Sequence, residues 1–393
     1  MKRKMPIIIS FTLLISSVIG QSLPEDLLFS YEIEERIANG DLRIPSASYY
    51  YTYIGNYHEA IATYDIPVSW GVDTLELQQF QIKPALDRII EEAREKQIVI
   101  ISESHLKPQH RIFAKEIIVS LANHGFTHLG LETFAPDMTR TDQLLDTMLN
   151  RRGYADFRLT GTYSKEPHMA DLIRTAKRNN YELFGYQRDK EDPDRGREEI
   201  QADNIVKYIE NHPTEKVVIL CGWYHAVESS LPERKKSLWM AHYLKIKHEI
   251  DPLTIYQDNF TEKVLQNEHS LMTKIQIDQH SVFIDNHNQI ARLSDKVDVE
   301  VIHPKTKYVN GRPGWLYQDQ TYKEYALDRS LLDIEFPILI KAYVLGEQHD
   351  GTPIDIIELK EKYDQRKLIL KPGKYLLDIT NKMERKEIEI DVE

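Results

Sequence analysis

Three short apolar runs in the sequence each end in residues that can hold or move a proton. They are Ile98–Ile101 followed by Glu103 and His105, His128–Leu131 followed by Glu132, and Val217–Cys221 followed by Gly222-Trp223-Tyr224-His225. A neutral histidine can take a proton from water, while a carboxylate on its other ring nitrogen orients the ring and stabilises the imidazolium. Histidine and carboxylate can also bind a divalent metal that acidifies a water, and the candidate ligands are His105, Glu132 and His225.

Other reaction types find less support in the sequence. There is no nucleophilic serine in a Gly-x-Ser-x-Gly turn and no glycine-rich loop of the kind that cradles phosphates. The single cysteine, Cys221, sits within an apolar run, which favours a buried structural thiol over a nucleophile. Acid–base chemistry by histidine and glutamate, with or without a metal, is therefore the chemistry that this pattern favours.

Roles can be assigned to these side chains as a hypothesis. We assign His105 as general base for an attacking water, with Glu132 favoured over Glu103 as the carboxylate that orients it. His225 would bind or protonate the leaving group. Two arginines could hold an anionic substrate or a developing oxyanion, namely Arg188 at the end of the third predicted strand and Arg197 at the start of the next helix. His105 is expected to be exposed at its strand end and to pack little.

The elements around these residues must bring them together. The apolar runs are short, and the first is rich in β-branched residues, as is typical of buried parallel strands. Between them lie helix patterns, with helices expected at 107–123, 167–179, 197–211 and 238–246. Such alternation predicts an α/β fold with a mostly parallel sheet and flanking helices. Ligands bind at the carboxyl ends of strands in such sheets, where the candidate residues would converge on one pocket.

The pattern of apolar and polar residues divides the chain into five expected segments. We expect a signal peptide at 1–20, a helical N-terminal extension at 21–78 and the α/β core at 79–265. An irregular and β-rich extension of the core follows at 266–335, and a small antiparallel β module at 336–393. Tyrosines gather at 49–57 in the N-terminal extension, where packing is favoured over stacking on a ligand.

The N-terminus and the charge bear on location and partners. Lys2, Arg3 and Lys4 precede an apolar run that ends near Gly20, as in a cleaved secretory signal. The only cysteine, Cys221, lies far from the expected cleavage site, so no cysteine directly follows the signal as a site for lipidation. We therefore expect an exported protein, periplasmic or secreted, that is not lipidated and has no integral membrane segment after cleavage. A net charge of −12 argues against a nucleic-acid partner, and a small molecule or peptide is the expected substrate.

The motifs themselves resemble those of a known superfamily. Ser102-Glu103-Ser104-His105, Glu132, an arginine before a helix and Gly222-Trp223-Tyr224-His225 are similar to the paired Gly-x-x-His pattern of erythromycin esterases, ChaN-type haem-uptake lipoproteins and TIKI/TraB-type proteases. The resemblance covers about residues 80–260. The second motif matches fully, whereas the first has Ser102 where the family usually has glycine.

This resemblance implies an α/β fold with a His/Glu site at the strand ends. Members of the superfamily use the site for metal-free ester hydrolysis, metal-dependent proteolysis or haem binding. Two functions therefore stay open: an exported hydrolase of esters or amides, and a carrier of haem or another ligand that uses the same site. The sequence does not name a substrate.

Overall fold

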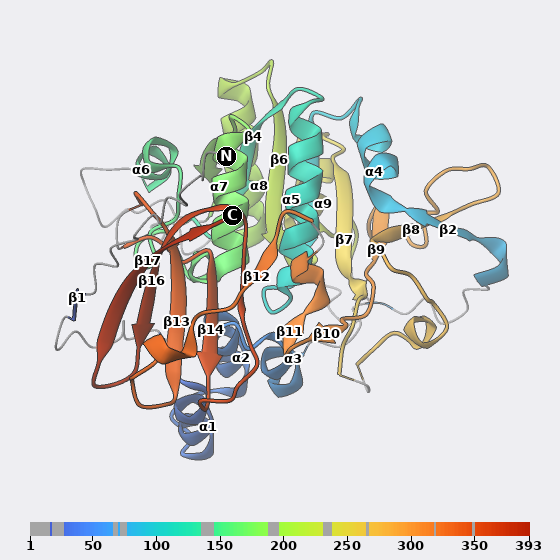
Figure 1. Cartoon of the computed structure of the whole chain (residues 1–393). Coiled ribbons are helices and arrows are strands. Elements are labelled where there is room, and N and C mark those ends of the chain that lie inside the picture. Colours follow the sequence, from blue (N-terminus) through green and yellow to red (C-terminus); the bar gives the residue numbers. More distant parts are fainter. Residues whose placement is uncertain are drawn as a thin grey trace, which may run out of the picture.

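The structure, a computed structural model, describes residues 16–17, 27–65, 70, 77–134, 145–187, 196–230, 238–264, 267–317, 320–347 and 350–393. Its largest element is an eight-stranded sheet with the order β2-β8-β9-β7-β3-β6-β4-β5 (Figure 1). The strands are β2 Gln81–Pro84, β3 Ile98–Glu103, β4 Phe126–Leu131, β5 Glu182–Gly185, β6 Lys216–Gly222, β7 Leu253–Phe260, β8 Ser281–Ile284 and β9 Val299–Ile302. The six strands from β9 to β5 run parallel, whereas β8 runs antiparallel to both of its neighbours, β9 and the edge strand β2.

Helices cover both faces of this sheet because its central strands are apolar on both sides. Val99 and Ile101 of β3 pack in the core beneath one helical layer, whereas Ile98 and Ile100 pack beneath the other. This alternation follows from the two-residue period of a strand. The first layer is α4 Ala85–Ala93, α5 Pro108–Ala122 and α7 Pro167–Arg178, and the second is α8 Arg197–Asn211 and α9 Met240–His248. Gly125, at φ +84°, ends the turn after α5 in the left-handed region expected there.

The C-terminal residues form a second, antiparallel sheet of the order β1-β17-β16-β13-β14. Its strands are β1 Ser16–Ser17, β13 Ile338–Val344, β14 Asp355–Leu359, β16 Gly373–Thr380 and β17 Arg385–Val392. Short pairs flank it, β10 Tyr308–Val309 with β11 Arg312–Pro313 and β12 Lys323–Tyr325 with β15 Leu368–Leu370. One face of the sheet has its own apolar core.

Three N-terminal helices lie against this C-terminal sheet, far away in sequence but adjacent in space (Figure 1). They are α1 Ser30–Ala38, α2 Ile44–Tyr53 and α3 Tyr57–Thr63. Their apolar residues share a core with Leu339 of β13 and Ile356 of β14. Glu358 joins the two ends of the chain by polar contacts, since it accepts hydrogen bonds from the Ser30 amide at 2.8 Å and from Asn56 Nδ2 at 2.7 Å.

The predicted fold class is confirmed: a mostly parallel sheet with flanking helices, an N-terminal helical part and a small C-terminal antiparallel module. Six strands were not predicted from the sequence, namely β1, β2, β10, β11, β12 and β14. The expected signal peptide at 1–20 lies outside the described residues, except for Ser16–Ser17, whose backbone pairs with β17. No helix in the described part of the chain is long and apolar enough to cross a membrane.

Candidate active site

The three predicted strand ends are neighbours in the sheet. Strand β6 lies between β3 and β4, and all three run parallel. Glu103 is in register with Gly222, so the residues that follow these two positions leave the sheet side by side. His105 comes two residues after the end of β3, Glu132 directly after β4, and His225 in the 3-10 turn η3, Trp223–Ala226.

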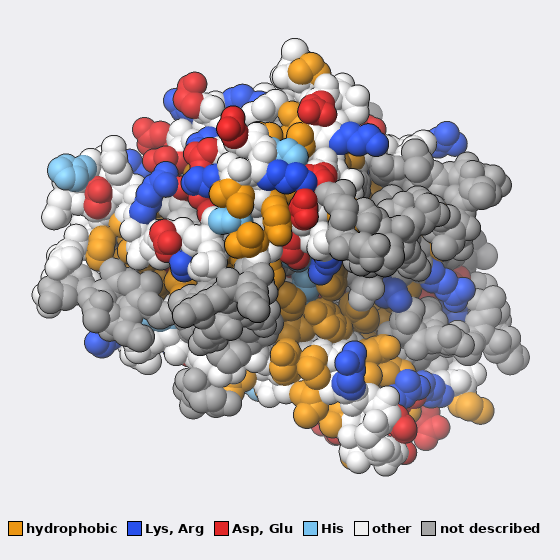
Figure 2. Space-filling model, turned by 180° about the vertical axis from the view of Figure 1, so that it is seen from behind, with side chains coloured by type: hydrophobic (Ala, Val, Ile, Leu, Met, Phe, Trp, Pro, Cys, Tyr) orange, Lys and Arg blue, Asp and Glu red, His pale blue; other side chains and the backbone are white. Residues whose placement is uncertain are grey.

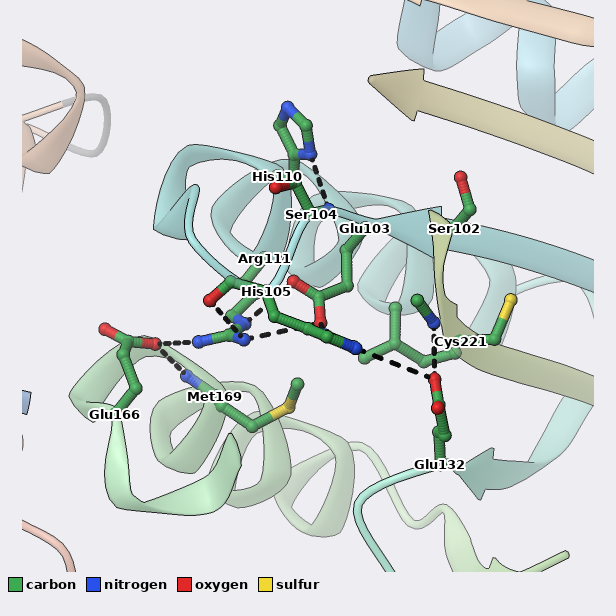
Figure 3. A network of polar contacts seen from close by, with 12 residues as sticks. Ser102, Glu103, Ser104, His105, His110, Arg111, Glu132, Glu166, Met169 and Cys221 are labelled. Atoms are coloured by element: carbon green, nitrogen blue, oxygen red, sulfur yellow. Dashed lines mark hydrogen bonds and ion pairs between the residues drawn. The ribbon is translucent and has the colours of Figure 1, made fainter. Parts of the chain in front are cut away.

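His105 is held from behind by a chain of buried charges (Figure 3). Its Nδ1 contacts Oε1 of Glu103, and Glu103 also accepts from Nε of Arg111 at 3.1 Å. Arg111 Nη1 in turn donates to Glu166 Oε2 at 2.8 Å. Glu166 caps the start of α7, where its carboxylate accepts from the amides of His168 at 3.0 Å and Met169 at 2.9 Å. These contacts connect the ring of His105 to strand β3 and to helices α5 and α7.

The carboxylate that orients His105 is therefore Glu103, and the preference for Glu132 was wrong. The reason is local: Glu103 is the last residue of β3, and the turn after it carries the His105 ring back onto the carboxylate. Burial by itself would raise the pKa of Glu103, but the charge of Arg111 and the contact with His105 hold that pKa below its usual range. An ionised Glu103 accepts the Nδ1–H of His105, so the neutral ring has its lone pair on Nε2.

Glu132 has other partners. Its Oε2 accepts from the amide of Gly222 at 2.5 Å and lies 4.0 Å from His105 Nε2, beyond hydrogen-bonding distance. Its Oε1 lies 2.5 Å from Arg197 Nη2 and 3.2 Å from His225 Nε2. Burial opposes ionisation of Glu132, but His225, His105 and Arg197 together hold its pKa well below the usual range. Glu132 is thus an anion at the centre of the site.

His225 lies between two carboxylates. Its Nε2 faces Glu132, and its Nδ1 lies 2.6 Å from Oε2 of Glu198 at the start of α8. Burial lowers the pKa of His225, but the two carboxylates outweigh that effect and raise it to about 9. His225 is consequently an imidazolium at neutral pH, a proton donor rather than a metal ligand or a base.

Gly222 allows these groups to come this close. A Cβ at residue 222 would lie 2.4 Å from both Cε1 and Nε2 of His105, and 3.2 Å from Glu132 Oε2. Any side chain here would displace the histidine ring or the carboxylate. The next residue, Trp223, has a φ of +32°, a conformation that costs free energy for a residue other than glycine and that is concentrated at functional sites.

Aromatic rings enclose the remaining sides of His105. Tyr163 stacks on its ring with centroids 3.7 Å apart, and Trp223 meets it edge-on at 4.4 Å. Tyr49, from α2 in the N-terminal part, lies 6.4 Å from His105 and 6.0 Å from Tyr163. We call Tyr49, Tyr163 and Trp223 the aromatic wall. One member of the tyrosine cluster thus lies at the site, although packing had been favoured for the cluster as a whole.

The site is more enclosed than the sequence suggested. His105 is 3% exposed and Glu132 6% exposed, so the expectation of an exposed histidine that packs little was wrong. Arg197 has a half-exposed side chain, and its guanidinium reaches the centre of the site through Glu132. Arg188 lies outside the described residues.

The geometry favours proton transfer over metal binding. Among the described residues, no group of three or more His, Cys, Asp or Glu side chains is arranged to hold a metal ion. Both ring nitrogens of His225 face carboxylates, which is the reason that the predicted set of His105, Glu132 and His225 does not form a set of ligands. Cys221 is buried beside the site, burial raises the pKa of its thiol well above the usual value, and it is not poised as a nucleophile.

Several functional candidates were missed by sequence reasoning: Arg111, Glu166, Glu198, Tyr163 and Trp223. Arg111 and Glu198 belong to the first or second turn of helices that follow strand ends, positions that could have drawn attention. Tyr163 and Glu166 come from a connection between helices, and no pattern in the sequence points to them.

No protein-family model matches the chain, and no curated protein matches it either. Solved structures that resemble it include the type III effector HopBA1, with 13% identity and a TM-score of 0.30 over 49% of this chain and 95% of that one. RRSP, a MARTX toxin effector domain from Vibrio vulnificus, has 15% identity and a TM-score of 0.30 over 52% of this chain and 41% of its own.

The C-terminal region of Pasteurella multocida toxin, with a thiol-protease-like catalytic triad, has 12% identity and a TM-score of 0.26. That alignment covers 48% of this chain and 25% of the toxin structure. Likenesses this distant do not bear on function.

Proposed function

We propose that the protein is a hydrolase that activates water with His105 and acts on an ester or amide. The observation that carries this proposal is the Glu103–His105 pair: an ionised, buried carboxylate on Nδ1 leaves the Nε2 lone pair directed at the centre of the site. Such a pair matches the arrangement by which a carboxylate orients a histidine base and stabilises its imidazolium.

In the proposed reaction, water attacks the carbonyl carbon while His105 Nε2 takes its proton. Glu103 stabilises the resulting imidazolium. Arg111 holds Glu103 in place by a direct hydrogen bond and is itself held by Glu166. The positive charge of His225 and Arg197 stabilises the oxyanion that develops on the carbonyl oxygen. When the tetrahedral intermediate collapses, His225 Nε2 gives a proton to the leaving oxygen or nitrogen. His105 then releases its proton to solvent and His225 takes one up from solvent, which restores both side chains to their starting states.

Membership in the superfamily of erythromycin esterases, ChaN-type and TIKI/TraB-type proteins belongs to the same proposal. It is supported by Gly222, since the glycine of the Gly-x-x-His motif has a physical task here: it gives His105 room beside the backbone. Export, with removal of residues 1–20, is proposed from the sequence alone. Mass spectrometry of the N-terminus of the exported protein tests it, and retention of Met1 in a membrane fraction would contradict it.

The alternative of a haem carrier finds less support in this geometry. An axial histidine must present a ring nitrogen to a planar macrocycle. His105 Nε2 instead faces Gly222 and Glu132, and Tyr163 covers one face of the ring. Titration of the purified protein with haemin, followed by the Soret band, distinguishes the two functions.

The decisive experiment is turnover of an ester and peptide library by wild type, His105→Ala and Glu103→Gln, each with and without a chelator. We expect turnover in wild type that survives the chelator and falls by about 10²–10⁴-fold in both variants. His287→Ala, at an exposed loop position, is the matched control and should act as wild type. A Soret band lost in His105→Ala, with no wild-type hydrolysis of any substrate, would assign the site to ligand carriage.

A further inference from the structure

A second cavity lies between helices α5 and α7 on one side and residues of the C-terminal half of the chain on the other. Its volume is about 410 Å³, within the range of small-molecule sites. Ile112 and Val119 of α5 lie in its wall, and Trp315 and Ile369 close it from the other side. None of the residues that line it belongs to the proposed catalytic group around His105, so the cavity is a separate candidate site.

Most of the wall is apolar. Ile112, Trp315 and Ile369 belong to one small apolar cluster, in which Trp315 has the largest ring. An apolar body that packs against these side chains gains about 25 cal/mol for each Å² of its surface that it removes from water. The body of a ligand for this cavity is therefore expected to be aromatic or aliphatic.

The charged side chains in the wall balance one another. They are two lysines and two carboxylates, Lys115, Lys371, Glu116 and Asp171. Lys115 Nζ lies 2.5 Å from Asp171 Oδ2, so these two form an ion pair. Glu116 and Lys371 each have an interaction of their own in the structure. A charged ligand would leave water here without gaining a free counter-charge, which costs free energy, so the wall favours an uncharged ligand.

One polar atom of a wall residue lacks a partner. Nε2 of His168 is buried and has no hydrogen-bond partner among the described residues. The ring lies between Tyr57 and Trp315, with centroids 5.7 Å and 5.5 Å away. Burial lowers the pKa of His168, so the ring is neutral and adds no charge to the wall. A buried polar atom without a partner lowers stability unless a ligand supplies the missing hydrogen bond.

We propose that this cavity binds a small uncharged molecule with an aromatic or branched aliphatic body and one hydroxyl group. The body packs on Trp315, Ile112 and Ile369, and the hydroxyl forms a hydrogen bond with Nε2 of His168. A hydroxyl suits this nitrogen because it can donate to a lone pair or accept from an N–H, so either tautomer of the neutral ring has a partner. The inference does not depend on the proposed hydrolysis at His105.

The test is calorimetric titration of the full chain at neutral pH with three ligands that share one body. They are 2-naphthol, the carboxylate 2-naphthoate, and 2-methylnaphthalene, which has no hydroxyl and is measured by competition. We expect one 2-naphthol per chain, bound at least about tenfold more tightly than 2-naphthoate, because no free cation compensates the carboxylate. It should also bind about fivefold more tightly than 2-methylnaphthalene, the value of about one hydrogen bond.

Two substitutions test the polar features separately. His168→Phe keeps a ring and removes the nitrogen, so the preference for 2-naphthol over 2-methylnaphthalene should disappear. Asp171→Asn removes the partner of Lys115, so 2-naphthoate should bind at least about fivefold more tightly than it does to wild type, whereas 2-naphthol should bind equally well. A hydroxyl preference that survives in His168→Phe would overturn the role of His168. Equal affinity of wild type for 2-naphthol and 2-naphthoate would overturn the selection of uncharged ligands.

A filling substitution and a control test the location. Val119→Trp, at a half-buried position of α5, should abolish 2-naphthol binding because the indole occupies the cavity. Lys207→Trp, at an exposed position of α8, should bind as wild type. Absence of 2-naphthol binding to wild type, or unchanged binding in Val119→Trp, would overturn the proposal. If Val119→Trp does not fold, as judged by circular dichroism, His168→Phe and Asp171→Asn still decide it.

Discussion

The backbone of Gly222 lies directly against the ring of His105, so that a Cβ at residue 222 would come within 2.4 Å of two ring atoms. This contact joins the end of β6 to the proposed base beyond the end of β3. It also explains why the second motif needs glycine, although the φ of Gly222, −86°, is one that any residue adopts.

Gly222→Ala should therefore slow turnover strongly while the protein stays folded. The added methyl group must push the His105 ring away from its position, and we expect kcat to fall by at least about 10²-fold, as for other misplaced catalytic groups. Overpacking should reduce the free energy of unfolding by about 1–3 kcal/mol. Gly196→Ala is the control, because a Cβ at residue 196 meets no atom within 4 Å. Wild-type turnover in Gly222→Ala would contradict the proposed position of His105.

The pKa of His225 predicts the alkaline limit of activity. Since two carboxylates raise it to about 9, the imidazolium is present below that pH and is lost as the pH rises through it. kcat should fall above pH 9. The stability that the His225 charge contributes is complete below its ordinary pKa of about 6.5 and is lost over the same alkaline range. An NMR titration of the His225 ring measures this pKa directly.

Glu198→Gln should move this limit toward neutral pH. The substitution removes one of the two negative charges beside His225, so the pKa of His225 and the alkaline limb of the rate profile should both fall. Glu199→Gln is the matched control, because Glu199 instead pairs with Lys247 at 2.7 Å near the surface. An alkaline limb unchanged in Glu198→Gln would exclude His225 as the group that sets it.

Arg111→Lys should destabilise the fold although it keeps the charge. Arg111 is buried and bridges Glu103 and Glu166, which a single ammonium group cannot do with the same geometry. We expect a loss of about 2–4 kcal/mol in the free energy of unfolding, measured in urea, together with slower turnover. Arg88→Lys is the control, because Arg88 is partly exposed and its contacts with Glu91 and Asn288 lie at the surface; it should change stability by less than about 1 kcal/mol.

The sequence was a good guide to the central strands and to the convergence of His105, Glu132 and His225, because short β-branched runs and the strand-end rule depend on local pattern and topology. It was a poor guide to which side chains contact one another within the site. Glu103 rather than Glu132 orients His105, because the turn after β3, not the strand ends, determines that contact. Glu198 and Tyr163 come from segments brought near only by tertiary packing, so no spacing in the sequence relates them to the histidines.

Glu358→Gln should weaken the contact between the two ends of the chain. The buried carboxylate accepts from the Ser30 amide and from Asn56, and the amide that replaces it cannot accept at both oxygens. We expect a loss of about 1–3 kcal/mol in the free energy of unfolding. Glu361→Gln, at an exposed position two residues beyond β14, should have no measurable effect. Equal melting temperatures of the two variants would show that this contact contributes little.

The same joining of the two ends has a consequence for biosynthesis. Tyr49 of the aromatic wall is carried by α2, and the helices of that region share their core with β13 and β14, which are synthesised much later than α2. During synthesis the α/β core can form before the layer that supports Tyr49 is complete, since N-terminal parts of a chain fold first only where their contacts are already present. The nascent protein would therefore carry an incomplete aromatic wall beside His105 until β13 and β14 have been synthesised and have packed against the N-terminal helices.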